Sequence, residues 1–177
     1  MVAKFKLLQA HDVLHSRIFH VRKERWQAPN GSTFERDTVV HPGAVAIAPF
    51  DEKGRLLLIR QFRPATQDWM LEIPAGTLEK GEQPLACAKR ELIEEIGFSA
   101  KKWKKLGSIF TAPGFCSERI YLFKAEELKP AFAEKDEDEH IEEPICLTKK
   151  EVRAAIAKGK IIDAKTLSAL MCLQVMG

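Results

Sequence analysis

The chain has 177 residues, of which 45% are hydrophobic and 30% charged, with a net charge of +3 and four cysteines. This composition fits one globular domain with a small appendage and excludes disorder as a description of the whole chain. No apolar run approaches the roughly 20 residues of a membrane-spanning helix, and the N-terminus lacks the apolar stretch of a signal peptide. The widely spaced cysteines form no CxxC pair, so we expect reduced thiols and a cytoplasmic protein.

The charge is unevenly distributed along the chain. Residues 134–143, EKDEDEHIEE, contain seven acids and one lysine, so the rest of the chain is distinctly basic. A basic body suits an anionic substrate. The run KKWKK at residues 101–105 comes without a nucleic-acid-binding motif, and we interpret it as a solvated loop or strand edge. We therefore expect neither a nucleic acid nor a membrane as a partner.

Strand patterns dominate the first half of the chain. Residues 18–26 and 33–41 flank the turn APNG and predict an N-terminal hairpin. Because two strands alone are marginal in water, residues 1–43 should pack on the main domain or on a second copy of the chain. Apolar stretches at 44–50 and 55–62 predict a second hairpin in the centre of a sheet. Shorter strands are predicted at 70–74, 108–110, 119–125 and 144–147.

Three helices complete the predicted elements. Pro84 suits a first helical turn and Gly97 suits a helix end, which predicts a helix between them. Thr148 and Glu151 form a capping-box pattern before a second helix, and Asp163 can cap a third. The chain is therefore expected to be an α/β protein with a mixed sheet.

The first of these helices carries Glu91, Glu94 and Glu95 within five residues. Such neighbouring carboxylates repel one another on a helix, and no lysine follows four positions later to offset them. At 100° per residue they lie on an arc apart from the apolar stripe, so a solvated acidic face is one interpretation. Oxygen ligands without His or Cys suit a hard cation, which makes a Mg²⁺ or Mn²⁺ site the other interpretation.

The spacing around this helix is more specific than the acids alone. The segment GTLEKGEQPLACAKRELIEEIGF, residues 76–98, fills every position of the pattern GX5EX7REUXEEXGU, in which U is an apolar residue. In this it resembles the box of the Nudix hydrolases. The resemblance implies a Nudix α/β/α sandwich with a mixed sheet for residues 44–177, the catalytic domain. It also implies that residues 1–43 form a small antiparallel sheet used for dimerisation.

The resemblance also implies roles within the box. The metal ligands would be Ala75, through its carbonyl, Glu91, Glu94 and Glu95. Arg90 would hold the glutamates in place, and Glu82 would be structural or meet a further metal. A bound metal would neutralise the pyrophosphate and lower the pKa of the attacking water.

A second acidic segment, DEDEHI at residues 136–141, resembles a loop of the ADP-ribose pyrophosphatase branch of this family. In that branch a glutamate on the loop acts as general base, which implies Glu137 as the base and Glu139 as an extra metal ligand. A base must come within hydrogen-bond reach of the attacking water, and a loop that closes over substrate allows this. A solvated acidic loop is the alternative interpretation.

Similarity to the same branch extends along most of the chain, through IRQFRPATQDWMLEIPAG at 59–76 and APGFCSER at 112–119. The implied substrate contacts are Arg63 on the diphosphate, Glu118 at the distal sugar, Arg36 and Glu72. Ordinary surface ion pairs are the alternative for each of them. Relatives often have serine where this chain has Ala112, and Trp26 is a candidate for stacking on a base. The preferred base and sugar therefore stay open.

These implications describe a metal-dependent pyrophosphohydrolase acting on nucleoside diphosphate sugars, with Mg²⁺ or Mn²⁺ as cofactor. ADP-ribose is the first choice of substrate and GDP-mannose another, and the products would be a nucleoside monophosphate and a sugar phosphate. We also expect a homodimer. Two alternatives stay open: hydrolysis of another capped diphosphate, such as a dinucleoside polyphosphate or an RNA 5′ end, and a non-catalytic ADP-ribose or nucleotide sensor.

Overall fold

The structure is a computed structural model that describes residues 4–132 and 142–176, where the chain forms ten strands and three helices. Two compact units contain these elements: residues 1–43 with 110–119 form unit 1, and residues 44–109 with 120–177 form unit 2. The sequence-based division placed residues 110–119 with the catalytic domain. No helix in the described ranges is both long and apolar enough to cross a membrane.

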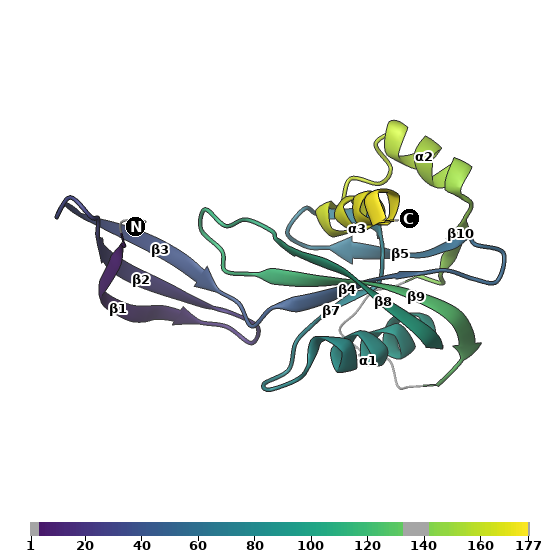
Figure 1. Cartoon of the computed structure of the whole chain (residues 1–177), viewed down its shortest axis with the longest axis horizontal. Helices are drawn as coiled ribbons and strands as arrows, with labels where there is room; N and C mark the ends of the chain where they lie inside the picture. Colours follow the sequence, from purple (N-terminus) through teal and green to yellow (C-terminus); the bar gives the residue numbers. More distant parts are fainter. Residues whose placement is uncertain (1–3, 133–141, 177) are drawn as a thin grey trace. The chain divides into compact units, whose positions relative to one another are not determined.

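Unit 1 is built on an antiparallel sheet in the order β1–β2–β3 (Figure 1). Its strands are β1 (Lys6–His15), β2 (His20–Gln27) and β3 (Thr33–Val40). The predicted hairpin corresponds to β2 and β3, which pair without interruption. The sequence pattern did not predict β1. Register shifts at Leu8 and Val13 break the alternation that identifies a strand in a sequence.

The segment 110–119 is attached to the end of β3 by backbone hydrogen bonds. The N–H of Val39 donates to the carbonyl of Phe115 at 2.7 Å, and the N–H of Ser117 donates to the carbonyl of Val39 at 2.9 Å. The N–H of His41 also donates to the hydroxyl of Ser117 at 3.0 Å. These bonds make the segment part of unit 1.

Unit 2 contains two sheets, ordered β7–β4–β9–β8 and β10–β5–β6. Their strands are β4 (Ala44–Pro49), β5 (Leu56–Arg63), β6 (Asp68–Glu72), β7 (Ala75–Thr77), β8 (Phe98–Phe110), β9 (Arg119–Pro130) and β10 (Ile145–Leu147). β4 runs parallel to β9 and antiparallel to β7, so the sheet is mixed, as predicted. The lysine-rich run 101–105 lies within the long strand β8.

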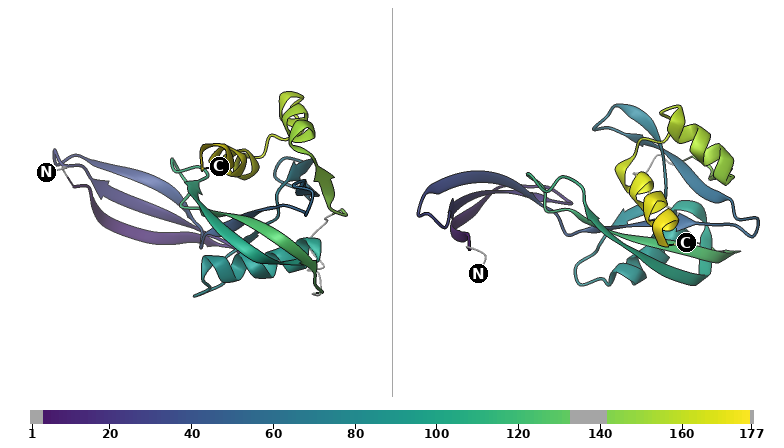
Figure 2. Two further views of the ribbon diagram at one scale, coloured as in Figure 1. Left: turned by 45° about the vertical axis from the view of Figure 1, so that its right-hand side comes forward. Right: turned by 45° about the horizontal axis from the view of Figure 1, so that its top comes forward.

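Helices cover both sides of these sheets (Figures 1 and 2). α1 (Pro84–Ile96) lies on one side, and α2 (Lys149–Ala157) and α3 (Ala164–Met176) lie on the other. In β4, the alternate residues Ala44, Ala46 and Ala48 join the core with α2 and α3, whereas Val45 and Ile47 join the core with α1. Strands that are buried on both faces appear in a sequence as continuous apolar runs. The predicted α/β/α sandwich is confirmed.

The helix ends follow the predicted signals. Gly97 ends α1 in the left-handed region, with φ of 71°. Thr148 and Glu151 form the predicted capping box of α2. Asp163 precedes α3 and accepts hydrogen bonds from the backbone N–H and the hydroxyl of Thr166, at 2.9 and 2.6 Å. The capping residues thus stabilise the observed ends of all three helices.

Candidate active site

The three glutamates of α1 differ in burial. Glu91 and Glu95 are only 7% and 2% exposed, whereas Glu94 is half-buried. The expectation that all three lie apart from the apolar stripe is therefore wrong for Glu91 and Glu95. They lie on the side of α1 that packs against β4 and β7, next to buried Leu92. Because burying an ionised carboxylate is costly without a partner, both need donors or cations nearby.

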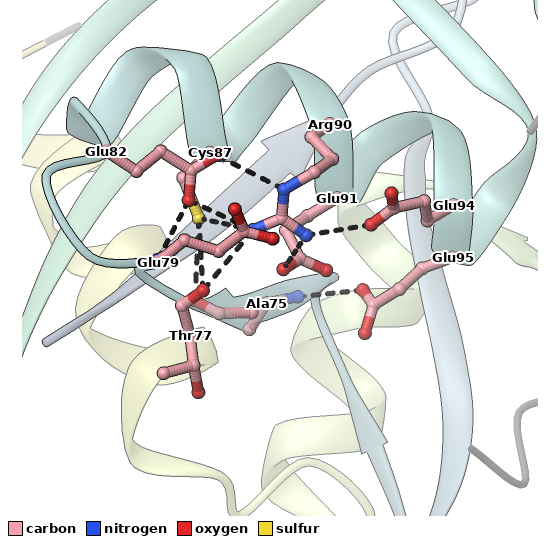
Figure 3. A network of polar contacts seen from close by, with 10 residues as sticks. Ala75, Thr77, Glu79, Glu82, Cys87, Arg90, Glu91, Glu94 and Glu95 are labelled. Atoms are coloured by element: carbon pink, nitrogen blue, oxygen red, sulfur yellow. Dashed lines mark hydrogen bonds and ion pairs between the residues drawn. The ribbon is translucent and has the colours of Figure 1, made fainter. Parts of the chain in front are cut away.

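Arg90 supplies part of that compensation (Figure 3). Its Nη1 lies 2.7 Å from Oε1 of Glu91 and 2.8 Å from Oε2 of Glu94. Its Nε and Nη2 each lie 3.1 Å from a carboxylate oxygen of Glu82. The hydrogen bonds to Glu82, with further attraction from Glu91 and Glu94, raise the pKa of Arg90 well above its ordinary value. One planar guanidinium thus holds three carboxylates, as its fork of donors allows.

The backbone that leads into the box approaches the same carboxylates. The N–H of Ala75 donates to Oε2 of Glu95 at 2.8 Å (Figure 3). Gly76 lies so close to Glu91 that an added Cβ would stand 1.8 Å from the carboxylate carbon. A side chain at this position would displace Glu91, so the glycine is required by close approach.

The donor set at this junction fits a hard divalent cation. Two buried carboxylates lie beside this backbone, Glu95 at Ala75 and Glu91 at Gly76, and oxygen ligands of this kind suit Mg²⁺ or Mn²⁺. In the part of the chain that the structure describes, no three acidic, histidine or cysteine side chains already form a metal-binding group. The guanidinium of Arg90 lies between the carboxylates of Glu91 and Glu94 and forms an ion pair with each. The four predicted ligands are thus brought together, and their role as ligands stays a prediction.

A second polar network joins β5, β6 and α3 within unit 2. Glu72 is fully buried; its Oε1 accepts from Nε of Arg63 at 2.7 Å, and its Oε2 contacts Nζ of Lys165. The Nζ of Lys165 also lies 3.1 Å from Oδ1 of Asp163. Burial lowers the pKa of Arg63, but the hydrogen bond to Glu72 and attraction from Glu72, Glu95 and Asp163 outweigh it and raise the pKa. Since Glu72 is fully buried, an ordinary surface ion pair, which was the alternative interpretation for Glu72, is wrong.

The other predicted substrate residues, Arg36 and Glu118, belong to unit 1. The guanidinium of Arg36 lies 4.7 Å from the ring centre of Phe34. A carboxylate oxygen of Glu118 lies 3.7 Å from Nε2 of His41. Both contacts lie within unit 1, and the roles of Arg36 and Glu118 in substrate binding stay predictions. The predicted base and extra metal ligand, Glu137 and Glu139, lie outside the described residues.

Arg36 lines a pocket of about 440 Å³ within unit 1. Its aromatic lining consists of Phe5, Trp26, Phe34, Phe110 and Phe115. The indole Nε1 of Trp26 donates to a carboxylate oxygen of Glu24 at 3.0 Å, and the hydroxyl of Thr38 donates to the same oxygen at 3.2 Å. These bonds restrain the indole, so the pocket offers a fixed aromatic wall.

The sequence pattern does not single out Lys165, although it lies in the buried network. One signal was available. Lys165 falls in the first turn of α3, where the helix dipole disfavours a cation. Residues that break a local rule in this way tend to have a functional or tertiary reason.

Comparisons with known proteins agree with the site. Residues 40–170 match the NUDIX domain family. The chain is 37% identical over 172 residues to the ADP-ribose pyrophosphatase of Bacillus subtilis strain 168, covering 96% of this chain and 92% of the relative. Identity and coverage are the same for the methanol dehydrogenase activator of Bacillus methanolicus.

A solved structure extends the similarity to the fold. The crystal structure of an ADP compounds hydrolase superposes with a TM-score of 0.86 at 27% identity, covering 98% of this chain and 94% of that chain. The matched residues include α1, Arg90 and the Ala75–Gly76 approach, which together build the carboxylate cluster. The chain belongs to the NUDIX hydrolase family.

Proposed function

We propose that the chain hydrolyses the pyrophosphate bond of nucleoside diphosphate sugars, with ADP-ribose as the first choice and GDP-mannose as another substrate. One observation carries this proposal: two buried acids meet the backbone that leads into the box, Glu95 at the N–H of Ala75 and Glu91 at Gly76. The cation Arg63 lies close enough for its charge to be attracted by that of Glu95. Acidic oxygens for a metal beside a cation for a phosphate are what a diphosphate requires. Similarity to an ADP-ribose pyrophosphatase supports the choice of nucleotide.

Within unit 2, Arg63 is proposed to bind the diphosphate, and the glutamates of α1 are proposed to bind the metal. Arg63 binds Glu72 through Nε, and its Nη groups make no hydrogen bond to the described residues. Those groups are available to phosphate oxygens, which the planar fork of arginine matches. Glu91, Glu94, Glu95 and the Ala75 carbonyl would hold Mg²⁺ or Mn²⁺. A bound cation would neutralise the diphosphate and lower the pKa of a water.

Unit 1 is proposed to recognise the rest of the substrate. A nucleobase can stack on the fixed indole of Trp26, which stabilises binding by about 1 to 3 kcal/mol per base in other proteins. Arg36 lines the same pocket and adds a positive charge, and Glu118 is proposed to face the distal sugar. The same unit is proposed to form a homodimer. The four cysteines are free thiols, which supports a cytoplasmic location.

A panel of substrates with the Glu137→Gln variant tests the proposed function. Wild type with Mg²⁺ should cleave ADP-ribose or GDP-mannose to a nucleoside monophosphate and a sugar phosphate. A dinucleoside polyphosphate and a capped RNA should be poor substrates. If Glu137 is the base, Glu137→Gln should lower kcat by roughly 100-fold or more.

Glu143→Gln is the matched control, since Glu143 is exposed and belongs to the same acidic run. It should keep the wild-type kcat. A near-normal kcat for Glu137→Gln would show that the base is another residue. Micromolar binding of ADP-ribose without turnover by the wild type would favour the sensor.

A further inference from the structure

We infer that Lys165 is a positioning residue for diphosphate binding, which acts on Arg63 through the buried carboxylate of Glu72. The inference rests on the proposed function and concerns a residue outside the Nudix box. Lys165 belongs to α3, on the opposite side of the unit 2 sheets from α1.

The two carboxylate oxygens of Glu72 contact two different cations. One carboxylate oxygen accepts from Nε of Arg63, and the other contacts Nζ of Lys165. Glu72 is fully buried and Lys165 is 7% exposed, whereas the Arg63 side chain is 36% exposed. Lys165 therefore lies on the interior side of the carboxylate, and Arg63 is the partner that ligands can reach.

This arrangement controls how many donors Arg63 keeps for a ligand. With Lys165 on one oxygen, the guanidinium needs only its Nε for Glu72, and both Nη groups stay available. Without Lys165, that oxygen of Glu72 would be left in the interior without its cation, which is costly. The Arg63 guanidinium would then satisfy both oxygens in the two-pronged geometry that arginine and carboxylate favour. One Nη group would be turned from the phosphate to Glu72.

The same turn of α3 also fixes the backbone next to Glu72. The hydroxyl of Thr166 accepts the N–H of Ile73 at 3.0 Å, while Asp163 holds the backbone and hydroxyl of Thr166. Two residues after Ile73, the N–H of Ala75 donates to Glu95. The first turn of α3 is thus hydrogen-bonded to the backbone that connects Glu72 with the carboxylate cluster.

The position of Lys165 in the first turn of α3 is electrostatically unfavourable for the helix itself. A cation in a first turn meets the positive end of the helix dipole. Its compensation comes from two carboxylates, Asp163 of the cap and Glu72 of β6. A lysine at such a position is better explained by its contact with Glu72 than by the stability of α3.

The test compares KM and kcat for ADP-ribose in wild type, Lys165→Met, Arg63→Ala and the double variant. Because Arg63 would contact the diphosphate before and during reaction, Lys165→Met should raise KM about tenfold and change kcat less. In the Arg63→Ala background, Lys165→Met should raise KM no further, since residues that act through one another are not additive.

Val152→Ala provides the structural control. Val152 is buried in α2 and contributes to the core with α3 without entering the Glu72 network. It should lower the melting temperature and leave KM unchanged. If Lys165→Met does not fold, Lys165→Met combined with Glu72→Gln removes the buried charge, and its KM should equal that of Glu72→Gln alone.

Two results would overturn the inference: a KM for Lys165→Met within twofold of wild type, or an equal rise in KM with and without Arg63. Failure of the proposed function looks different. In that case wild type and Val152→Ala would both fail to cleave any nucleoside diphosphate sugar in the panel.

Discussion

Gly76 offers the smallest change that tests the carboxylate cluster. In Gly76→Ala the new methyl would fall within 1.8 Å of the Glu91 carboxylate carbon, so Glu91 must move. A displacement of this size at a proposed metal ligand should lower kcat/KM by about 100-fold or more. Activity against ADP-ribose with Mg²⁺, measured beside the melting temperature, checks this.

Gly54→Ala is the matched control for that change. Gly54 has φ of 70° and open space around the position of a Cβ, so its substitution strains the backbone without meeting a carboxylate. It should lose some stability and keep its activity. Wild-type activity in Gly76→Ala would mean that the position of Glu91 does not matter for hydrolysis.

The pairing of Glu82 with Arg90 predicts a dependence of stability on pH. Hydrogen bonds from Arg90 hold the pKa of Glu82 below its ordinary 4.5. The stability from this pairing is therefore fully present above about pH 4.5 and is lost as the pH falls through the lower folded value. The difference in unfolding free energy between wild type and Glu82→Gln should be constant from pH 6 to 8 and shrink in acid. Urea unfolding across this range measures it.

Glu52→Gln gives the comparison for this acid effect. Glu52 is exposed in the turn between β4 and β5, so its substitution should leave the pH profile unchanged. A wild-type advantage over Glu82→Gln that persists undiminished at pH 3 would show that the advantage does not depend on the ionised form of Glu82. Below pH 4.5 other carboxylates also protonate, which is why the difference between variants is the quantity to follow.

At the scale of elements, the sequence predicted those parts whose signal is local. β4 and β5 appear as apolar runs because both faces are buried, and the ends of α1 and α2 carry their capping residues. β1 was missed because bulges at Leu8 and Val13 interrupt its pattern. β8 was predicted only at its end, since its lysine-rich first half lacks an apolar alternation.

The site divides in the same way. The spacing of the box identified Glu91, Glu94, Glu95 and Arg90 because they are neighbours on one helix. The burial of Glu91 and Glu95 depends instead on the position of β7 next to α1, and a helical wheel of α1 alone gives no information about that position. Lys165 meets Glu72 across 93 positions of sequence, so only the packing of α3 on the sheets could show that contact.

At the scale of the whole molecule, the outer strand of unit 1, β1, exposes apolar side chains. Every described residue of β1 is exposed, and its apolar members include Leu7, Leu8, Val13 and Leu14. Leu7 and Leu8 lie near one end of β1 and Val13 and Leu14 near the other, and exposed apolar side chains grouped on one element are candidates for an interaction site. The proposed homodimer would bury them against a second copy of the chain. We therefore expect the protein to have the mass of a dimer in solution.

Leu8→Lys combined with Val13→Lys tests this expectation. Both residues stand at register shifts of β1 without a cross-strand partner, so the substitutions should leave the pairing of β1 with β2 intact. Two added charges per chain would have to be desolvated in a dimer, which is unfavourable. Light scattering after size exclusion should show a dimer for wild type and a monomer for the variant, with unchanged circular dichroism. Lys4→Glu, an exposed change before β1, is the control. A monomeric wild type, or a dimeric double variant, would show that β1 does not form the interface.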